Sequence, residues 1–243
     1  MALFHGKYGI IPACDVDSLG QLYDLVSATC RLEFIVGYKI GMELVIAFSV
    51  ATVSDAIRQH TALPIIYDHQ KFGTDIPDIC RGRVLDVLKS AGINALIIFP
   101  HSGIETLKAT VSGCKEKGIV PIVGGEMTHK GYLVSEGGYI ADDSPKRIYA
   151  DAASLGVEYF VIPGTKINSM KLHKKTLSNI IPTPSFLFPG IGSGQGGDII
   201  EAFSAVSPYP SYAIVGRGIY GQADKRLAAT KLWNAVASKL PVQ

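Results

Sequence analysis

The sequence predicts a closed α/β barrel of eight parallel strands and eight helices, and two observations lead to it. Short, unbroken apolar runs rich in β-branched residues alternate eight times with longer segments whose apolar residues recur at helical spacing. The 243 residues also contain no linker or low-complexity stretch that would divide them. Eight evenly spaced units in this length favour one (β/α)8 TIM-barrel domain over residues 1–243, with an open doubly wound sheet as the alternative.

The apolar runs are expected to be strands that are buried on both faces. In chain order they are Tyr8–Cys14, Phe34–Ile40, Pro64–His69, Ala95–Pro100, Val120–Glu126, Tyr159–Gly164, Ser185–Gly192 and Tyr212–Gly218.

The segments between them are expected to be amphipathic helices, and several carry start and stop signals. Ser18 precedes the first helix, Pro145 stands in the first turn of the fifth, and Gly118 follows the fourth. In chain order the helices are Ser18–Leu32, Leu44–His60, Asp78–Ala91, Gly103–Lys117, Ser144–Leu155, Asn168–Leu177, Gly197–Val206 and Lys225–Leu240.

The composition is that of an ordinary globular protein, and it argues against several classes of partner. A formal net charge of +2 gives no global reason to expect nucleic-acid or membrane binding, so any anion site must be local. The amino-terminal residues lack the apolar stretch of a signal peptide, and no apolar run is long enough to span a membrane. The four cysteines have no metal-binding spacing, and we interpret Cys14 as a small buried apolar residue. We expect a cytoplasmic protein.

The charged residues around the third strand are the candidate chemical centre. Asp68, Lys71 and Asp75 follow this strand, and Lys39 lies in the second. Residues at the carboxyl ends of barrel strands converge on one mouth, where barrel enzymes have their active sites. A lysine between carboxylates keeps its proton and can deliver it to a carbon that becomes anionic. The alternative is a solvated cluster of ion pairs without chemistry.

Two glycine-rich segments, after the seventh and eighth strands, predict a phosphate site. Glycines allow the backbone to approach an anion closely, and barrels commonly bind phosphate at these two loops. Arg217, beside Gly216, can add a charge-assisted contact. The alternative is that these glycines serve only tight turns.

Taken together, these segments resemble the orotidine 5′-phosphate decarboxylase family. The resemblance runs from Ile10 to about Leu227. The segments that carry it, in the family's order, are Ala13–Asp15, Tyr38–Gly41, Asp68–Pro77, Glu126–His129, Pro189–Gly192, Gln195–Asp198 and Val215–Tyr220.

The resemblance implies an activity and a role for each matching residue. The expected reaction converts orotidine 5′-phosphate to uridine 5′-phosphate and carbon dioxide, in de novo pyrimidine biosynthesis, with neither metal nor organic cofactor. Lys71 should protonate C6 within a network that includes Lys39 and Asp68. Asp75 should reach the neighbouring subunit's site in a homodimer. The implied contacts with the nucleotide are Asp15 to the ribose, Thr128 to the pyrimidine edge, Pro189 to the pocket wall, and Gln195, Gly216 and Arg217 to the phosphate.

The chain departs from the family's pattern at its centre. The family's usual motif is Asp-x-Lys-x-x-Asp, whereas residues 68–75 read Asp-x-x-Lys-x-x-x-Asp, with one extra residue in each gap. Two alternatives therefore stay open. One is a magnesium-dependent sugar-phosphate decarboxylase or aldolase of the same superfamily, and the other is a non-catalytic barrel that binds nucleotide phosphates.

Overall fold

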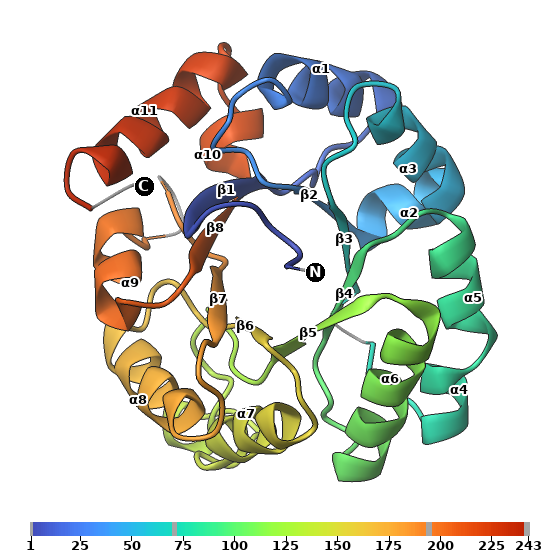
Figure 1. Ribbon diagram of the computed structural model, residues 1–243, viewed down its shortest axis with the longest axis vertical. Coiled ribbons are helices and arrows are strands. Elements are labelled where there is room, and N and C mark those ends of the chain that lie inside the picture. The colour runs from blue at the N-terminus through green and yellow to red at the C-terminus, as the bar shows by residue number, and fades with distance from the viewer. Residues whose placement is uncertain (1, 70–71, 193–195, 241–243) are drawn as a thin grey trace.

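Eight parallel strands curl into a barrel surrounded by helices in the computed structural model, which describes residues 2–69, 72–192 and 196–240 (Figure 1). Neighbouring strands follow the order β1-β8-β7-β6-β5-β4-β3-β2. Isolated bridges pair Ile10 with Ile35 and Ala13 with Lys39. They join the first strand to the second strand and the residues before it, and so close the ring. The predicted (β/α)8 barrel is therefore confirmed.

The strands are shorter than the apolar runs that predicted them. Most end two to four residues early, because apolar character reports burial rather than pairing. Phe99, for example, follows the fourth strand and is still buried. The strands are β1 Tyr8–Pro12, β2 Tyr38–Gly41, β3 Ile65–Asp68, β4 Ala95–Ile98, β5 Val120–Gly124, β6 Tyr159–Val161, β7 Ser185–Phe188 and β8 Ser211–Val215.

Two predicted helices are each divided in two, and one short helix was not predicted. The breaks fall at Ser49, which has a φ of 64°, and at Gly82. The segment Arg217–Tyr220, whose start was predicted to be strand, is helical. The α-helices are α1 Leu19–Thr29, α2 Met42–Phe48, α3 Val50–Arg58, α4 Pro77–Arg81, α5 Arg83–Ser90, α6 Ile104–Lys117, α7 Ser144–Ser154, α8 Ile167–Ser178, α9 Ile199–Val206, α10 Arg217–Tyr220 and α11 Lys225–Ala237, and a 3-10 turn, η1, spans Val134–Glu136.

The predicted end signals of two helices are confirmed. The Ser18 hydroxyl accepts a hydrogen bond of 3.2 Å from the Gln21 backbone N–H and so caps α1. Gly118 ends α6 with a φ of 66°, a left-handed conformation that glycine adopts without steric cost.

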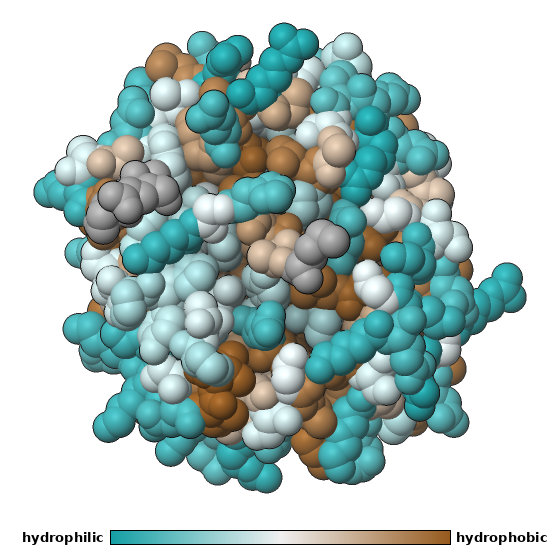
Figure 2. Space-filling view, in the orientation of Figure 1, coloured by the Kyte–Doolittle hydropathy of each residue, from teal (hydrophilic) through white to brown (hydrophobic). Residues whose placement is uncertain are grey.

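One end of the barrel is filled by the amino-terminal segment, which Figure 1 shows at the centre of the ring of strands. Phe4 is buried there and packs edge-on against Tyr159 at 5.8 Å between ring centroids. The Tyr159 hydroxyl accepts a hydrogen bond from the Leu3 backbone N–H, and the Tyr212 hydroxyl donates one to the Gly6 carbonyl. Figure 2 shows the same side of the molecule, with hydrophilic side chains along its rim. These contacts leave the opposite end, where the strands finish, for a site.

No helix among the described residues is both long enough and apolar enough to cross a membrane.

Candidate active site

The first three strands bring together Asp15, Lys39 and Asp68, which we call the mouth cluster. Lys39 Nζ lies 3.1 Å from Asp15 Oδ1 and 3.1 Å from Asp68 Oδ2. The contact follows from the parallel pairing of β2 with β3, which places Gly41 opposite Asp68, and from the bridge between Ala13 and Lys39. A Cβ at Gly41 would lie 3.0 Å from Asp15 Oδ1, so glycine at this position leaves room for the carboxylate. The predicted association of Lys39 with Asp68 is present.

The mouth cluster combines a firmly protonated lysine with an incompletely paired carboxylate. Burial alone would lower the pKa of Lys39, but the charges and hydrogen bonds of Asp68 and Asp15 outweigh this effect and raise it above its ordinary value. Asp68 Oδ1 is buried and has no hydrogen-bond partner among the described residues. Such an atom is costly to leave unpaired, so it marks a place where a ligand or a mobile group can complete the site.

Three residues that were predicted separately line one small cavity beside the mouth cluster. The cavity has a volume of about 50 Å³ and is lined by Asp68, Thr128 and Pro189 from the ends of three different strands. Phe99 and Glu126 also line it. A Cβ at Gly124 would lie 2.3 Å from the Phe99 ring, so this aromatic wall depends on glycine in β5.

The glycine-rich loops after β7 and β8 meet next to Asp15. A Cβ at Gly218 would lie 4.0 Å from the Gly192 Cα, and one at Gly216 would lie 3.9 Å from Asp15 Oδ2. Arg217 is exposed and has no ion pair with any residue that the structure describes. The guanidinium is therefore available to an anion at the loops.

Three predicted site residues are not placed in this arrangement by the described part of the chain. Lys71 and Gln195 lie outside the described residues. Asp75 is exposed just before α4, where its Oδ1 accepts a hydrogen bond of 2.7 Å from the Ile76 backbone N–H.

His69 and His101 have local hydrogen-bonding roles, and Cys14 is buried as the sequence suggested. His69 Nδ1 lies 2.9 Å from the Tyr67 hydroxyl, and His101 Nε2 lies 2.8 Å from the Tyr132 hydroxyl. Burial, reinforced by the Asp15 charge, raises the pKa of Cys14, so this thiol stays neutral. Within the described ranges, no three His, Cys, Asp or Glu side chains are grouped to hold a metal ion.

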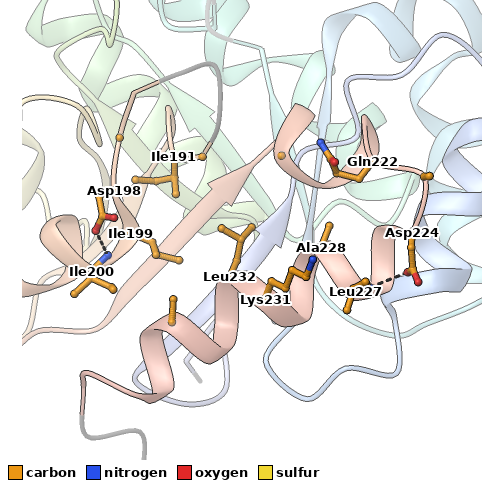
Figure 3. Close-up of a pocket in the computed structure, with 15 residues that line it drawn as sticks. Ile191, Asp198, Ile199, Ile200, Gln222, Asp224, Leu227, Ala228, Lys231 and Leu232 are labelled. Carbon is orange, nitrogen blue, oxygen red and sulfur yellow. Dashed lines mark hydrogen bonds between the residues drawn. The ribbon is translucent and has the colours of Figure 1, made fainter.

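A much larger hollow, of about 620 Å³, lies between α9 and α11 (Figure 3). It touches Gly192 and Gly218 from the outside of the glycine loops, but none of the mouth-cluster residues lines it. Its walls include the apolar side chains of Ile199, Leu227 and Leu232. Size does not select a site, because a further hollow of about 650 Å³, lined by Thr128, Glu136 and Lys166, is as large. The charges that can do chemistry favour the small cavity.

Among the residues of the small cavity that sequence reasoning missed are Phe99 and Glu126. Phe99 was assigned to a strand, and Glu126 was noted only as part of a motif. A signal for Glu126 existed at the start of α8, where Lys166, just before the helix, and Ser169 and His173 within it recur at helical spacing and all contact its carboxylate.

The model of the Orotidine 5'-phosphate decarboxylase / HUMPS family matches residues 9–232. The chain belongs to this family. The orotidine 5'-phosphate decarboxylase of Methanosarcina barkeri is 29% identical over 203 residues, which cover 82% of each chain. That of Thermoplasma volcanium is 26% identical over 92% of this chain and 90% of its own. The crystal structure of orotidine 5'-monophosphate decarboxylase from Methanocaldococcus jannaschii, complexed with the inhibitor BMP, superposes with a TM-score of 0.79, at 21% identity over 93% of this chain and 97% of that one. At this identity the superposition supports the fold.

Proposed function

We propose that this protein decarboxylates orotidine 5′-phosphate to uridine 5′-phosphate and carbon dioxide, as a carboxy-lyase of de novo pyrimidine biosynthesis. The observation that carries the proposal is the mouth cluster. A buried lysine is held between two carboxylates at the edge of a cavity that Thr128 and Pro189 also line. The family and the names of its curated relatives agree with this chemistry.

In the proposed reaction, the bond between C6 and the carboxylate breaks, carbon dioxide leaves, and the electron pair stays on C6. Lys71 then transfers a proton from its ammonium group to C6. Asp68 is fixed through Oδ2 by Lys39, and its Oδ1, which has no hydrogen-bond partner among the described residues, would face the substrate carboxylate. The repulsion between these two carboxylates disappears as carbon dioxide departs, which lowers the barrier.

The rest of the nucleotide is held by groups around the mouth. Asp15, whose side chain is 43% exposed, binds the ribose hydroxyls while it supports Lys39. Thr128 meets the pyrimidine edge, and Pro189 lines the pocket. Gln195, Gly216 and Arg217 bind the phosphate. This remote anion contributes binding energy that is used in the transition state.

A turnover assay with a chelator tests the proposal against its two rivals. Purified protein receives orotidine 5′-phosphate and excess EDTA, and the change in absorbance on decarboxylation is followed. We expect turnover, because the proposed reaction needs neither metal nor cofactor. Turnover of a sugar phosphate that requires magnesium would replace the proposal with the first rival. Tight binding of uridine 5′-phosphate without any turnover would replace it with the second.

We further propose that the working unit is a cytoplasmic homodimer in which Asp75 completes the partner's site. Asp75 adjoins two apolar side chains that no part of the described chain covers: Ile76 is 60% exposed and Ile79 is 54% exposed. Such neighbours fit an interface that carries Asp75 to a second subunit.

Subunit complementation tests this arrangement. Lys71→Ala and Asp75→Asn are each expected to be inactive alone. When equal amounts are mixed and allowed to exchange, half of the dimers are hybrids with one intact site, so about a quarter of the wild-type activity should return. No recovery in mixtures that are shown to exchange subunits would place Asp75 in its own subunit's site.

A further inference from the structure

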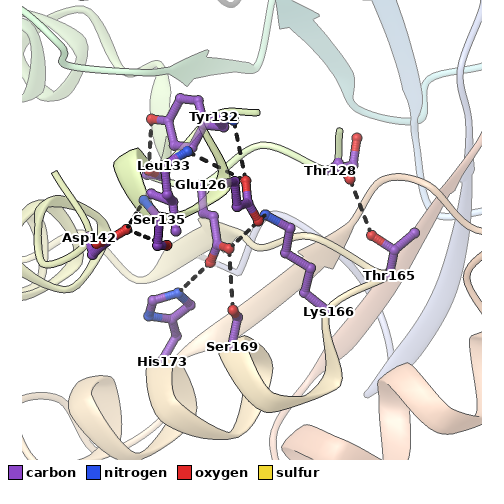
Figure 4. Close-up of polar contacts among 12 residues, drawn as sticks. Glu126, Thr128, Tyr132, Leu133, Ser135, Asp142, Thr165, Lys166, Ser169 and His173 are labelled. Atoms are coloured by element: carbon purple, nitrogen blue, oxygen red, sulfur yellow. Dashed lines mark hydrogen bonds and ion pairs between the residues drawn. The ribbon is translucent and has the colours of Figure 1, made fainter. Parts of the chain in front are cut away.

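A second charged group reaches the small cavity through Glu126 and joins the loop after β5 to α8 (Figure 4). Glu126 is buried, and its Oε1 accepts from Lys166 Nζ at 3.1 Å and from Ser169 Oγ at 3.2 Å. Its Oε2 accepts from His173 Nε2 at 2.9 Å. Lys166 also contacts Glu136 Oε1 at 2.7 Å. We call Glu126, Glu136, Lys166, Ser169 and His173 the loop cluster.

The loop cluster fixes both ends of one loop. Glu126 stands at the start of the segment after β5, and Glu136 stands in η1, ten residues later. Glu136 Oε2 accepts from the backbone N–H groups of Tyr132 at 3.2 Å and Leu133 at 3.4 Å. Lys166 therefore connects two carboxylates that hold the loop from either side.

The same helix start also holds Thr128. The Thr165 hydroxyl donates to the Thr128 carbonyl at 3.5 Å, and Thr165 is the residue before Lys166. On its other side, Thr128 faces the β7 loop, where a Cβ at Gly190 would lie 3.2 Å from Thr128 Cγ2. Thr128 thus stands between α8 and the loop that contains Pro189.

The charge state and hydrogen bonding of the loop cluster suit a group that holds the loop in place rather than one that reacts with a substrate. Burial would raise the pKa of Glu126, but the hydrogen bonds from His173 and Lys166 outweigh it and lower this pKa. All four carboxylate oxygens of Glu126 and Glu136 have partners. A buried carboxylate is costly unless it is paired, and here complete pairing gives a rigid connection next to the cavity.

We propose that Glu126 and Lys166 are positioning residues that fix Thr128 for recognition of the pyrimidine. The proposal rests on the proposed function, because Thr128 is assigned there to the pyrimidine edge. The ionic contacts restrain the loop against α8, and the loop in turn presents Thr128 to the cavity. Neither Glu126 nor Lys166 takes part in bond breaking.

A double-mutant cycle between Lys166→Met and Thr128→Val tests the proposal. The valine keeps the shape of threonine and removes its hydroxyl. Lys166→Met should raise KM for orotidine 5′-phosphate and Kd for uridine 5′-phosphate by about three- to tenfold, the value of one lost hydrogen bond, and change kcat less. Affinity for ribose 5-phosphate, which has no base, should not change. The double variant should be no weaker than Thr128→Val alone.

Two control variants separate positioning from general loosening. Lys166→Arg should restore KM, since a guanidinium can also bridge two carboxylates. Lys108→Met removes an exposed ion pair to Glu105 on α6 and should leave both constants unchanged. If Lys166→Met does not fold, Glu126→Gln takes its place in the cycle.

The proposal would be overturned if the increases in KM of the two single variants multiply in the double variant. It would also be overturned if Lys166→Met weakens the binding of ribose 5-phosphate as much as that of uridine 5′-phosphate. A measurement without ligand keeps it separate from the proposed function. Hydrogen exchange in residues 128–138 should be faster in Lys166→Met than in the wild type, and unchanged exchange would also overturn the proposal. A wild-type protein that does not turn over orotidine 5′-phosphate would refute the proposed function, while the exchange result still decides whether Lys166 restrains the loop.

Discussion

The mouth cluster and the loop cluster have the same charge pattern, a lysine between two carboxylates, but they differ in how completely they are paired. In the mouth cluster, Lys39 bridges Asp15 and Asp68, and Asp68 Oδ1 has no partner among the described residues. In the loop cluster, Lys166 bridges Glu126 and Glu136, and every carboxylate oxygen accepts a hydrogen bond.

This difference in pairing distinguishes the mouth cluster, which can act on a substrate, from the loop cluster, which holds a loop in place. An unpaired buried oxygen can interact with a substrate as charge develops, whereas a saturated carboxylate has no further hydrogen bond to offer without breaking one. Charge pattern and burial alone would not distinguish the two clusters, because Glu126 is at least as buried as Asp68.

The largest expected effect is that of removing Lys71, the proposed acid. Lys71→Ala should lower kcat by about 10²–10⁴-fold or more, the usual contribution of a positioned general acid. Binding of uridine 5′-phosphate should persist, since Lys71 acts on C6. Carbon dioxide release and calorimetric binding measure the two effects, and retained kcat would remove Lys71 from the mechanism.

Replacing the central lysine of each cluster should affect folding stability unequally. Lys39→Met leaves two carboxylates facing each other in the mouth, and loss of one partner from a buried ion pair costs about 3–5 kcal/mol. Lys166 is more exposed, with 18% of its side chain accessible against 9% for Lys39, so Lys166→Met should cost less. Urea unfolding gives both values. A larger loss for Lys166 would reverse the comparison.

The glycine-rich loops after β7 and β8 should contribute to nucleotide binding and not to the chemical step. Arg217→Ala should weaken uridine 5′-phosphate binding by about 10- to 100-fold, because a hydrogen bond to a charged group is worth about 1.5–3 kcal/mol. Arg226→Ala removes an exposed arginine from α11 and is the matched control. Equal Kd values for the two variants would exclude Arg217 from the phosphate site.

The smallest expected effect is a pH dependence that comes from the loop cluster. The folded-state pKa of Glu126 is lowered from its ordinary value of 4.5, so its contribution to stability is present above that value and is lost as pH falls through the folded pKa. Glu126→Gln should therefore destabilise the protein at pH 7 and converge with the wild type as the solution becomes acidic. A difference in melting temperature that stays constant with pH would contradict this sign.

The barrel could be predicted from sequence because its strands are buried on both faces and therefore appear as unbroken apolar runs. The positions of strand ends could not, since residues such as Phe99 stay buried after pairing stops. The division of one predicted helix at Ser49 was also hidden, because its left-handed backbone is unusual for serine.

The mouth cluster could be predicted in part. Strand ends converge in a barrel, which grouped Lys39 with Asp68, but the bridge from Lys39 to Asp15 depends on strand register. The loop cluster depends on the packing of α8 and the residue before it against a loop 30 to 47 residues earlier in the chain. The helical spacing of Lys166, Ser169 and His173 marks one side of this contact but does not specify its partners. Lys71 stays a prediction from the motif.

The most direct measurement is the same change made once in each cluster, from carboxylate to amide. Asp68→Asn and Glu126→Gln are compared by kcat for carbon dioxide release from orotidine 5′-phosphate, with folding verified by thermal unfolding. We expect Asp68→Asn to lose kcat by orders of magnitude, and Glu126→Gln to keep most of its kcat and change mainly in KM. Equal losses of kcat, or a greater loss in Glu126→Gln, would contradict the assignment of chemistry to the mouth cluster.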